Sequence, residues 1–272
     1  MSDRRLNLED YLESECALCP SSSVKPIPQK RIIEKMDEYM DRQDFAGAER
    51  HLLYWLGEAR MVCDMRGQLF LCNELVGYYR KMNNKEKAFA YGEKALALLN
   101  ELDFAGYTSA ATTYVNYATA CNAFGENEKA LALFKSAKDI YESRETDPSL
   151  LGGLYNNMGL AQVALGRYDE AYALYDAALE QMGKVENGEL EQAITLLNRC
   201  DALEAQLGME EAEEQIFALL DEALALLKIP TIPRDGYYAF VLEKCAPVFG
   251  YYGCFMAAEE LAAVAKEIYA RT

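Results

Sequence analysis

The sequence predicts an all-α protein of about six helix pairs, and three observations carry this prediction. A small residue recurs at a nearly constant interval through most of the 272 residues. Apolar residues around it recur every three or four positions, as they do along one face of an amphipathic helix. Glycines and prolines lie where these helical stretches break. Repetition at a fixed period is typical of solenoids, in which each repeat packs against its neighbours.

The period is visible in a recurrent alanine. Six alanines follow one another at intervals of 40, 42, 41, 41 and 46 residues: Ala48, Ala88, Ala130, Ala171, Ala212 and Ala258. Each period has room for two helices, and the six expected pairs span about 29–64, 67–102, 106–143, 148–183, 189–228 and 234–271. Residues 1–28, which are rich in proline and serine, are expected to form a tail or linker before a repeat domain at 29–272.

The fourth pair shows the pattern most clearly. One face of its first helix carries Leu154, Met158, Ala161 and Leu165. One face of its second helix carries Ala171, Leu174, Tyr175, Ala178 and Leu179. Asp147 is expected to cap the first helix ahead of Pro148, and Gly166 is expected to permit the tight turn between the two helices.

Other glycines and prolines fit the same map. Turns like that of Gly166 are expected at Gly125, Gly208 and Gly253. Pro230 and Pro233 lie between the fifth and sixth pairs, where the interval lengthens to 46 residues. Pro247 falls inside an expected helix of the last pair and is expected to kink it.

The pattern within each pair resembles the tetratricopeptide repeat. In the fourth pair the matching residues are Tyr155, Met158, Gly159, Gly166, Tyr168, Ala171, Tyr175 and Ala178, and in the third they are Tyr114, Tyr117, Ala118, Gly125, Ala130, Phe134 and Ala137. The resemblance covers about residues 29–271 and implies that Gly159 and Ala171 lie where two helices touch. The long period, together with Asn156 and Asn157, resembles the kinesin-light-chain subclass. The resemblance implies that the six helix pairs form a right-handed superhelix, a repeat scaffold whose first helices line a concave groove for peptides or helices.

Three asparagines hold the same position in successive first helices: Asn116, Asn157 and Asn198. In kinesin-light-chain-like repeats an asparagine at this position points into the groove and bonds to the backbone of a bound peptide. An amide suits that role because it both donates and accepts hydrogen bonds. With Asn156 beside Asn157, these residues are the predicted peptide-binding set. The alternative interpretation is a ladder of hydrogen bonds that holds successive repeats together.

Charge excludes some partners. The chain has 27 Lys and Arg against 44 Asp and Glu, a net charge of −17, which argues against binding nucleic acid or an anionic membrane. Residues 145–229 carry 4 basic and 17 acidic side chains. A solvated acidic face explains this excess, and the end of a groove for a basic peptide is the alternative. The N-terminus has no apolar signal-peptide core, so a cytoplasmic location with reduced cysteines is expected.

No residue pattern predicts catalysis, a metal or a cofactor. Cys16 and Cys19 form the only CxxC motif, and a structural zinc site needs about four ligands. The other six cysteines are expected to pack in helices. His51, the single histidine, is expected to lie half-exposed against Trp55. The protein is therefore expected not to be an enzyme.

Three tyrosine pairs are candidates for ligand contact: Tyr78 with Tyr79, Tyr237 with Tyr238, and Tyr251 with Tyr252. Adjacent residues on a helix point about 100° apart, so one member of each pair is expected to leave the core.

The expected function is that of an adaptor that binds a peptide or helix of another protein in the concave groove. The alternative is a sensor, a repeat regulator whose shape changes when a signalling peptide binds. Small-angle scattering with and without ligand would separate the two, since only the sensor must change shape.

Overall fold

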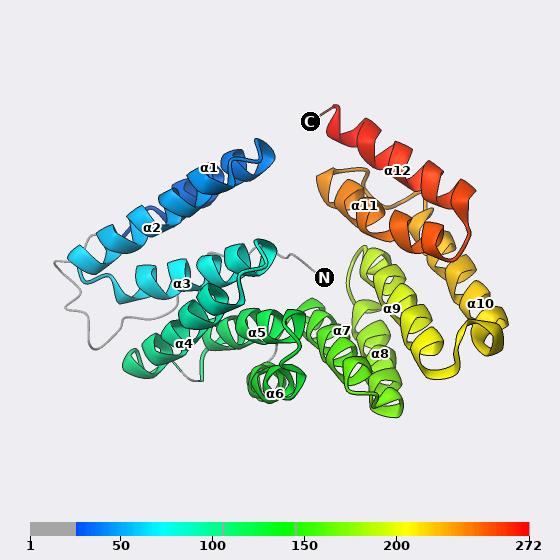
Figure 1. The fold of residues 1–272 in the computed structure, drawn as a ribbon, viewed down its shortest axis with the longest axis horizontal. Coiled ribbons are helices and arrows are strands. Elements are labelled where there is room, and N and C mark those ends of the chain that lie inside the picture. The colour runs from blue at the N-terminus through cyan, green and yellow to red at the C-terminus, as the bar shows by residue number, and fades with distance from the viewer. Residues whose placement is uncertain (1–25, 105, 145, 272) are drawn as a thin grey trace. The chain divides into compact units, whose positions relative to one another are not determined.

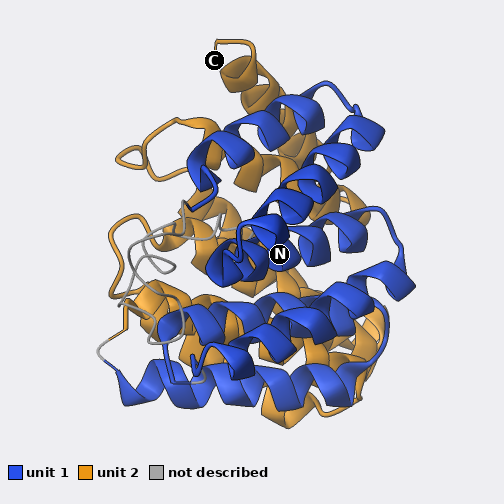
Figure 2. Cartoon of the chain, turned by 90° about the vertical axis from the view of Figure 1, so that its left-hand side faces the viewer, with its two compact units in different colours: residues 1–145 blue, residues 146–272 orange. Residues whose placement is uncertain are grey.

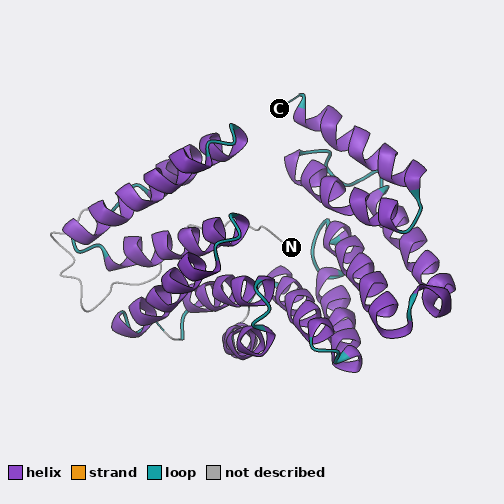
Figure 3. Cartoon of the chain, in the orientation of Figure 1, coloured by secondary structure: helices purple, strands orange, loops and turns teal. Residues whose placement is uncertain are grey.

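The computed structural model describes residues 26–104, 106–144 and 146–271. These residues form twelve α-helices and contain no strand (Figures 1 and 3). The predicted all-α fold of helix pairs is confirmed.

The chain divides into two compact units, Met1–Glu145 and Thr146–Thr272 (Figure 2). Unit 1 holds six helices: α1 (Gln29–Asp41), α2 (Phe45–Met61), α3 (Met65–Lys81), α4 (Lys85–Glu101), α5 (Thr108–Ala123) and α6 (Asn127–Ser143). Unit 2 holds α7 (Pro148–Ala164), α8 (Tyr168–Met182), α9 (Glu189–Leu207), α10 (Met209–Leu227), α11 (Gly236–Tyr251) and α12 (Phe255–Tyr269). The division into a tail and one repeat domain stays a prediction, and most of the tail lies outside the described residues.

The helices of unit 1 are separated by very short turns. Each of the first three turns combines a residue at positive φ with a polar residue that caps the next helix: Gln43 with Asp44, Cys63 with Asp64, and Asn83 with Asn84. The cap accepts a hydrogen bond from a backbone N–H in the first turn of the helix, which would otherwise lack a partner.

Asp64 has a second role in unit 1. Its Oδ1 accepts the N–H of Gly67 at 2.8 Å and its Oδ2 accepts the N–H of Ile27 at 2.9 Å. Both Asp64 and Ile27 are buried. This one carboxylate therefore caps α3 and also holds the segment that leads into α1.

Glycines in the helices allow close packing of large rings. A Cβ on Gly92 of α4 would collide with the ring of Tyr117 of α5, and a Cβ on Gly159 of α7 would collide with the ring of Tyr175 of α8. Ala171, also on α8, is fully buried. The expected positions of Gly159 and Ala171 between two helices are confirmed.

The predicted glycine turns and the predicted cap of α7 are also confirmed. Asp147 accepts the N–H of Ser149 at 2.9 Å, with Pro148 in the first turn of α7. The glycines expected in turns have positive φ: 79° at Gly125, 72° at Gly166, 82° at Gly208 and 82° at Gly253. Pro247 lies inside α11, and the helix continues to Tyr251.

Candidate peptide-binding surface

The first helices of successive pairs lie next to one another within each unit. In unit 1, α3 contacts α5; in unit 2, α7 contacts α9 and α9 contacts α11. The three in-phase asparagines lie on these helices, with Asn116 on α5, Asn157 on α7 and Asn198 on α9.

In unit 2 the structure brings Asn156 and Asn198 together. Nδ2 of Asn198 donates to Oδ1 of Asn156 at 3.0 Å, and only 6% of Asn156 is exposed. Asn157, the next residue along α7, is half-buried, and its side chain makes no hydrogen bond within the part of the chain that the structure describes. Asn156 and Asn198 thus link two repeats, whereas the amide of Asn157 is open to a ligand.

In unit 1, Asn116 is half-buried and its side chain likewise makes no hydrogen bond to any described residue. The link between the first helices is made by other residues, because Nδ2 of Asn73 donates to Oγ1 of Thr113 at 2.9 Å. We did not predict this pair from the sequence. Asn73 precedes Ala88 by 15 residues, as Asn156 precedes Ala171 by 15, so the period contained the signal.

Two carboxylates lie next to Asn198 on α9. The hydroxyl of Tyr252 donates to Asp201 or Glu204, with both distances 3.0 Å, and the hydroxyl of Tyr251 donates to Glu204 at 2.9 Å. Burial raises the pKa of Asp201. The pKa of Tyr252 is also raised, by burial and by the two carboxylates. Asp201 and Glu204, which follow Asn198 along α9, therefore present hydrogen-bonded carboxyl groups, whereas Arg199 between them and Asn198 pairs with Asp176 of α8.

Other acidic residues of this region begin second helices. Asp169 and Glu170 lie in the first turn of α8, and Glu210 and Glu211 lie in the first turn of α10. Acidic side chains are favourable there because the helix dipole is positive at the N-terminus. All four are exposed, so they form part of a solvated surface.

The expectation for the tyrosine pairs is correct for two and wrong for one. Tyr237 is 39% exposed beside buried Tyr238, and Tyr251 is 69% exposed beside buried Tyr252. Tyr78 and Tyr79, in contrast, are both buried.

The reason is that neighbouring helices provide partners for both hydroxyls of the first pair. The hydroxyl of Tyr78 donates to the carbonyl of Phe45 at 2.8 Å, and that of Tyr79 donates to Glu49 at 2.7 Å. Both acceptors lie on α2, which packs against α3.

His51 is half-buried on α2, as expected, and the expectation for two of the cysteines needs correction. Nε2 of His51 lies 3.1 Å from the carbonyl of Ile32, and its ring contacts Tyr39 of α1, whereas Trp55 packs against Tyr54. Cys63 lies in a turn and Cys254 precedes α12, so these two thiols are not within helices.

The remaining cysteines in the described residues are buried as expected: Cys72, Cys121, Cys200 and Cys245. Burial raises the pKa of Cys72 to about 12 and that of Cys121 to about 11, so both are protonated thiols at neutral pH. Cys16 and Cys19 lie outside the described residues.

The described residues contain no group of three or more His, Cys, Asp or Glu side chains that could hold a metal ion. In the same part of the chain, no helix combines the length and the apolar content that crossing a bilayer requires.

Comparison with known proteins gives a family match and a set of similar folds. Residues 70–143, which run from α3 to the end of α6, match a family model described as tetratricopeptide repeat. The expected resemblance is confirmed, although the match falls on the second and third pairs. No curated protein matches the chain significantly.

The similar solved structures include two of a protein with TPR-like repeats. A putative kinesin light chain of Podosopora anserina with nearly identical TPR-like repeats is 19% identical, with 75% of this chain and 96% of that chain covered and a TM-score of 0.50. A variant of that protein with one substituted residue is 17% identical, with 75% and 95% covered and a TM-score of 0.51. BtubC (BKLC) from P. vanneervenii is 18% identical over 89% of each chain, with a TM-score of 0.47. At these identities the likeness concerns the fold alone.

Proposed function

Because this chain carries tetratricopeptide repeats, which generally mediate contacts between proteins, we propose that it is a cytoplasmic adaptor that binds a peptide or helix of another protein along its first helices. The observation that carries the proposal is the pair of open amides at Asn116 and Asn157. Each is half-buried, lies on a first helix and makes no hydrogen bond through its side chain to a described residue. Each amide can therefore donate to a backbone carbonyl and accept from a backbone N–H of a bound peptide.

Asn198 has a different part in this proposal. Its Nδ2 is used by Asn156, but its Oδ1 remains an acceptor. The bond to Asn156 fixes the orientation of the Asn198 amide, and an oriented group loses less entropy when a ligand binds.

The ligand in this proposal is basic. Asp201 and Glu204 follow Asn198 along α9 at the spacing of one helical turn, and both accept hydrogen bonds from tyrosine hydroxyls that leave further lone pairs open. A Lys or Arg side chain of a peptide bound at Asn198 would lie next to these carboxylates. The same charge disfavours nucleic acid and anionic membranes as partners.

The test begins with affinity capture from a native lysate, followed by identification of the bound segment and titration of a synthetic peptide. Asn116→Ala and Asn157→Ala are each expected to weaken peptide binding by a few-fold to about tenfold, since one hydrogen bond to a neutral backbone group contributes about 0.5–1.5 kcal/mol. The melting temperature is expected to remain that of the wild type, because neither amide has a partner within the described chain. Asn100→Ala, which removes an exposed asparagine from the second helix α4, is the matched control.

A variant of Asn156 distinguishes a role in the fold from a role in peptide binding. Asn156→Ala is expected to lower the melting temperature, since it removes the bond between α7 and α9. If Asn157→Ala and Asn116→Ala bind the peptide normally and melt early, the asparagines are internal scaffold and the binding proposal fails.

Salt tests the charge of the ligand. Binding at Asp201 and Glu204 is expected to weaken as salt rises, because exposed charges are screened beyond about 10 Å at 0.1 M. Affinity that does not change with salt would remove the basic peptide and leave the amides as the recognition element. An adaptor is expected to give the same small-angle scattering curve with and without peptide, apart from the added mass.

A further inference from the structure

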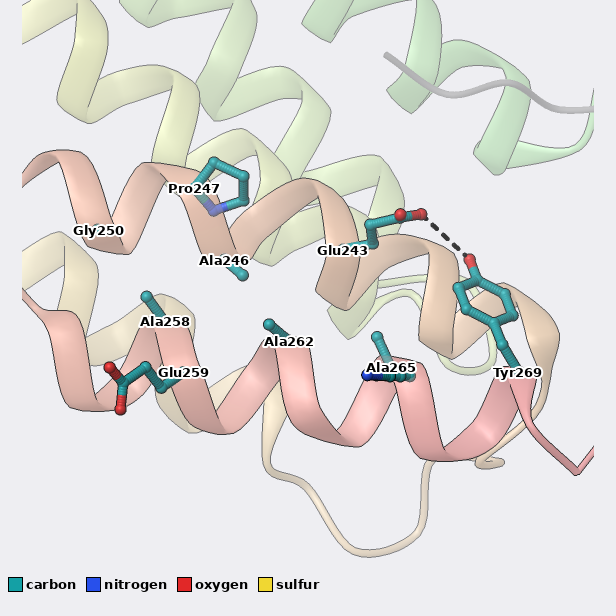
Figure 4. Close-up of a pocket in the computed structure, with 10 residues that line it drawn as sticks. Glu243, Ala246, Pro247, Gly250, Ala258, Glu259, Ala262, Ala265 and Tyr269 are labelled. Carbon is teal, nitrogen blue, oxygen red and sulfur yellow. Dashed lines mark hydrogen bonds between the residues drawn. The ribbon is translucent and has the colours of Figure 1, made fainter. Parts of the chain in front are cut away.

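A groove runs between α11 and α12, the last helices of unit 2. Its volume is about 660 Å³, and its walls include Ala246, Pro247, Gly250, Ala258 and Ala262. Figure 4 shows Ala246 projecting from α11 towards α12, and Ala258 and Ala262 projecting from α12 towards α11. Glu243, Glu259, Ala265, Lys266 and Tyr269 complete the lining.

The equivalent groove of an earlier pair is occupied by a helix. Ala202 of α9 packs against Ala171 and Tyr175 of α8, with Val163 and Tyr172 at the edge of the same cluster. α9 thus fills the groove between α7 and α8.

The fourth and last pairs can be aligned on their recurrent alanines, Ala171 and Ala258. In this alignment Val163, Tyr172 and Tyr175 of the fourth pair correspond to Gly250, Glu259 and Ala262 of the last pair. The last pair therefore has a smaller side chain than the fourth pair at each of these three positions, which leaves more room for a helix in its groove.

The exposed face of α12 is complementary to itself. Phe255 is 67% exposed and Tyr269 is 44% exposed, and Ala262 lies midway between them in the sequence. Glu259 lies three residues before Ala262 and Lys266 lies four residues after it. If two copies of α12 lie antiparallel with Ala262 at the centre, Phe255 of each is level with Tyr269 of the other. Glu259 of each then lies one residue along the axis from the level of Lys266 of the other, within reach of the long lysine side chain. A two-fold axis produces this arrangement, since every contact then occurs twice.

Charge favours this end of the chain for self-association. Residues 145–229 carry 4 basic and 17 acidic side chains, so two copies that met there would repel each other. Residues 230–272 carry 4 basic and 5 acidic side chains, so the repulsion is much smaller at the last pair. Alanine at the centre of the face also lets two helix backbones approach closely, because helix separation depends on side-chain size at the contact.

We propose that the α11–α12 groove binds α12 of a second copy of this chain, and that the two α12 helices pack antiparallel about a two-fold axis at Ala262. Each α12 then fills the groove of the other copy, as α9 fills the groove of α7 and α8. The proposal concerns oligomeric state and does not depend on peptide binding by the first helices.

The experiment is analytical ultracentrifugation of the full chain over a wide range of protein concentration. The wild type is expected to show a reversible monomer–dimer equilibrium. Ala262→Glu brings two like charges together at the axis, where such a juxtaposition costs several-fold to a few hundredfold in affinity, and we expect the dissociation constant to rise by about 100-fold. Ala263→Glu is the matched control, because Ala263 is also exposed but points about 100° away around the helix.

Charge exchange tests the antiparallel register. Glu259→Lys and Lys266→Glu are each expected to raise the dissociation constant by about tenfold, since each replaces two attractive contacts with repulsive ones. The double variant E259K/K266E restores both contacts with reversed sign and is expected to dimerise like the wild type. Circular dichroism checks that each variant keeps its helical content.

Four results would overturn the proposal. The first is a wild type that sediments as a monomer at every concentration, and the second is a dimer that Ala262→Glu leaves intact. The third is a double variant that dimerises no better than the single ones, because antiparallel pairing about Ala262 brings Glu259 close to Lys266 of the other copy. The fourth is growth of oligomers beyond a dimer, which would exclude a closed two-fold interface.

Discussion

Replacement of Gly159 by alanine tests how the paired helices of unit 2 approach each other. A Cβ built on Gly159 of α7 lies 2.8 Å from Cδ1 and 2.9 Å from Cζ of Tyr175, and closer still to Cε1. Tyr175 is fully buried, and its hydroxyl has no hydrogen-bond partner within the described residues. Packing alone therefore holds the ring, and it has no room to move away from the added carbon. Gly153, on the same helix, has open space around its Cβ position.

The expected free energies follow from two opposing effects. Glycine in a helix interior is less favourable than alanine by about 1 kcal/mol, so Gly153→Ala is expected to stabilise the protein by about that amount. Gly159→Ala has the same gain, but overpacking a filled interior costs about 1–3 kcal/mol. We therefore expect Gly159→Ala to range from neutral to about 2 kcal/mol less stable than the wild type. The two variants should differ by about 1–3 kcal/mol.

Urea unfolding followed by circular dichroism at 222 nm measures both variants against the wild type. A shift of midpoint at constant slope reports a change in stability rather than a change in the unfolded state. If Gly159→Ala is as stable as Gly153→Ala, the contact between α7 and α8 does not depend on a small residue at this position. The account of the helix pair given above would then be wrong.

Three further changes test other features of the fold. Asp64→Ala is expected to destabilise unit 1 by about 2–4 kcal/mol, because it removes the cap of α3 and leaves the buried N–H of Ile27 without an acceptor. Cys63→Gly is expected to stabilise by about 0.5–1 kcal/mol, because Cys63 has a φ of 55°, which is unfavourable for residues other than glycine. Asp201→Asn is expected to stabilise at neutral pH. Burial raises the folded-state pKa of Asp201 above its ordinary value of 3.8, so ionisation of this carboxyl destabilises the folded protein as pH rises through the folded-state pKa. Asparagine stays neutral and avoids this loss of stability.

Each of these changes has a measurement and a contrasting variant. For Asp64, the control is Asp44→Ala, which removes only a cap and should cost about 1 kcal/mol in urea unfolding. For Cys63, thermal unfolding should show the opposite sign for Gly125→Ala, where φ is 79°. For Asp201, unfolding measured from pH 3 to pH 8 should show no benefit of Asn below about pH 3.8. A benefit that is constant with pH would contradict the titration of Asp201.

Much of the fold follows from local patterns in the sequence. The recurrent alanines and the glycine turns predict where helices lie, because helical periodicity, caps and positive φ depend on residues within a few positions of one another. Gly166 and Asp147 are clear cases. The turn at Gly166 and the cap at Asp147 could be predicted from the neighbouring residues alone, and the structure confirms both.

The asparagines show that local patterns do not predict hydrogen-bond partners. The sequence placed Asn116, Asn157 and Asn198 in one position of the repeat, which implied one shared role. In the structure Asn198 bonds to Asn156, whereas Asn116 and Asn157 bond to no described residue. The difference arises on the neighbouring first helix, about 40 residues away in the sequence, because the side chain found there decides whether an amide has a partner.

The sequence by itself therefore determined the helical class, the period and the turns of this protein. Only the tertiary structure decided which polar side chains link repeats, why both Tyr78 and Tyr79 are buried, and which face of α12 is exposed. The physical reason is the distance along the sequence over which each interaction acts. Helix formation, capping and turn conformation are set within a few residues, whereas burial and hydrogen-bond partners are set by contacts between helices that the sequence separates by a whole repeat.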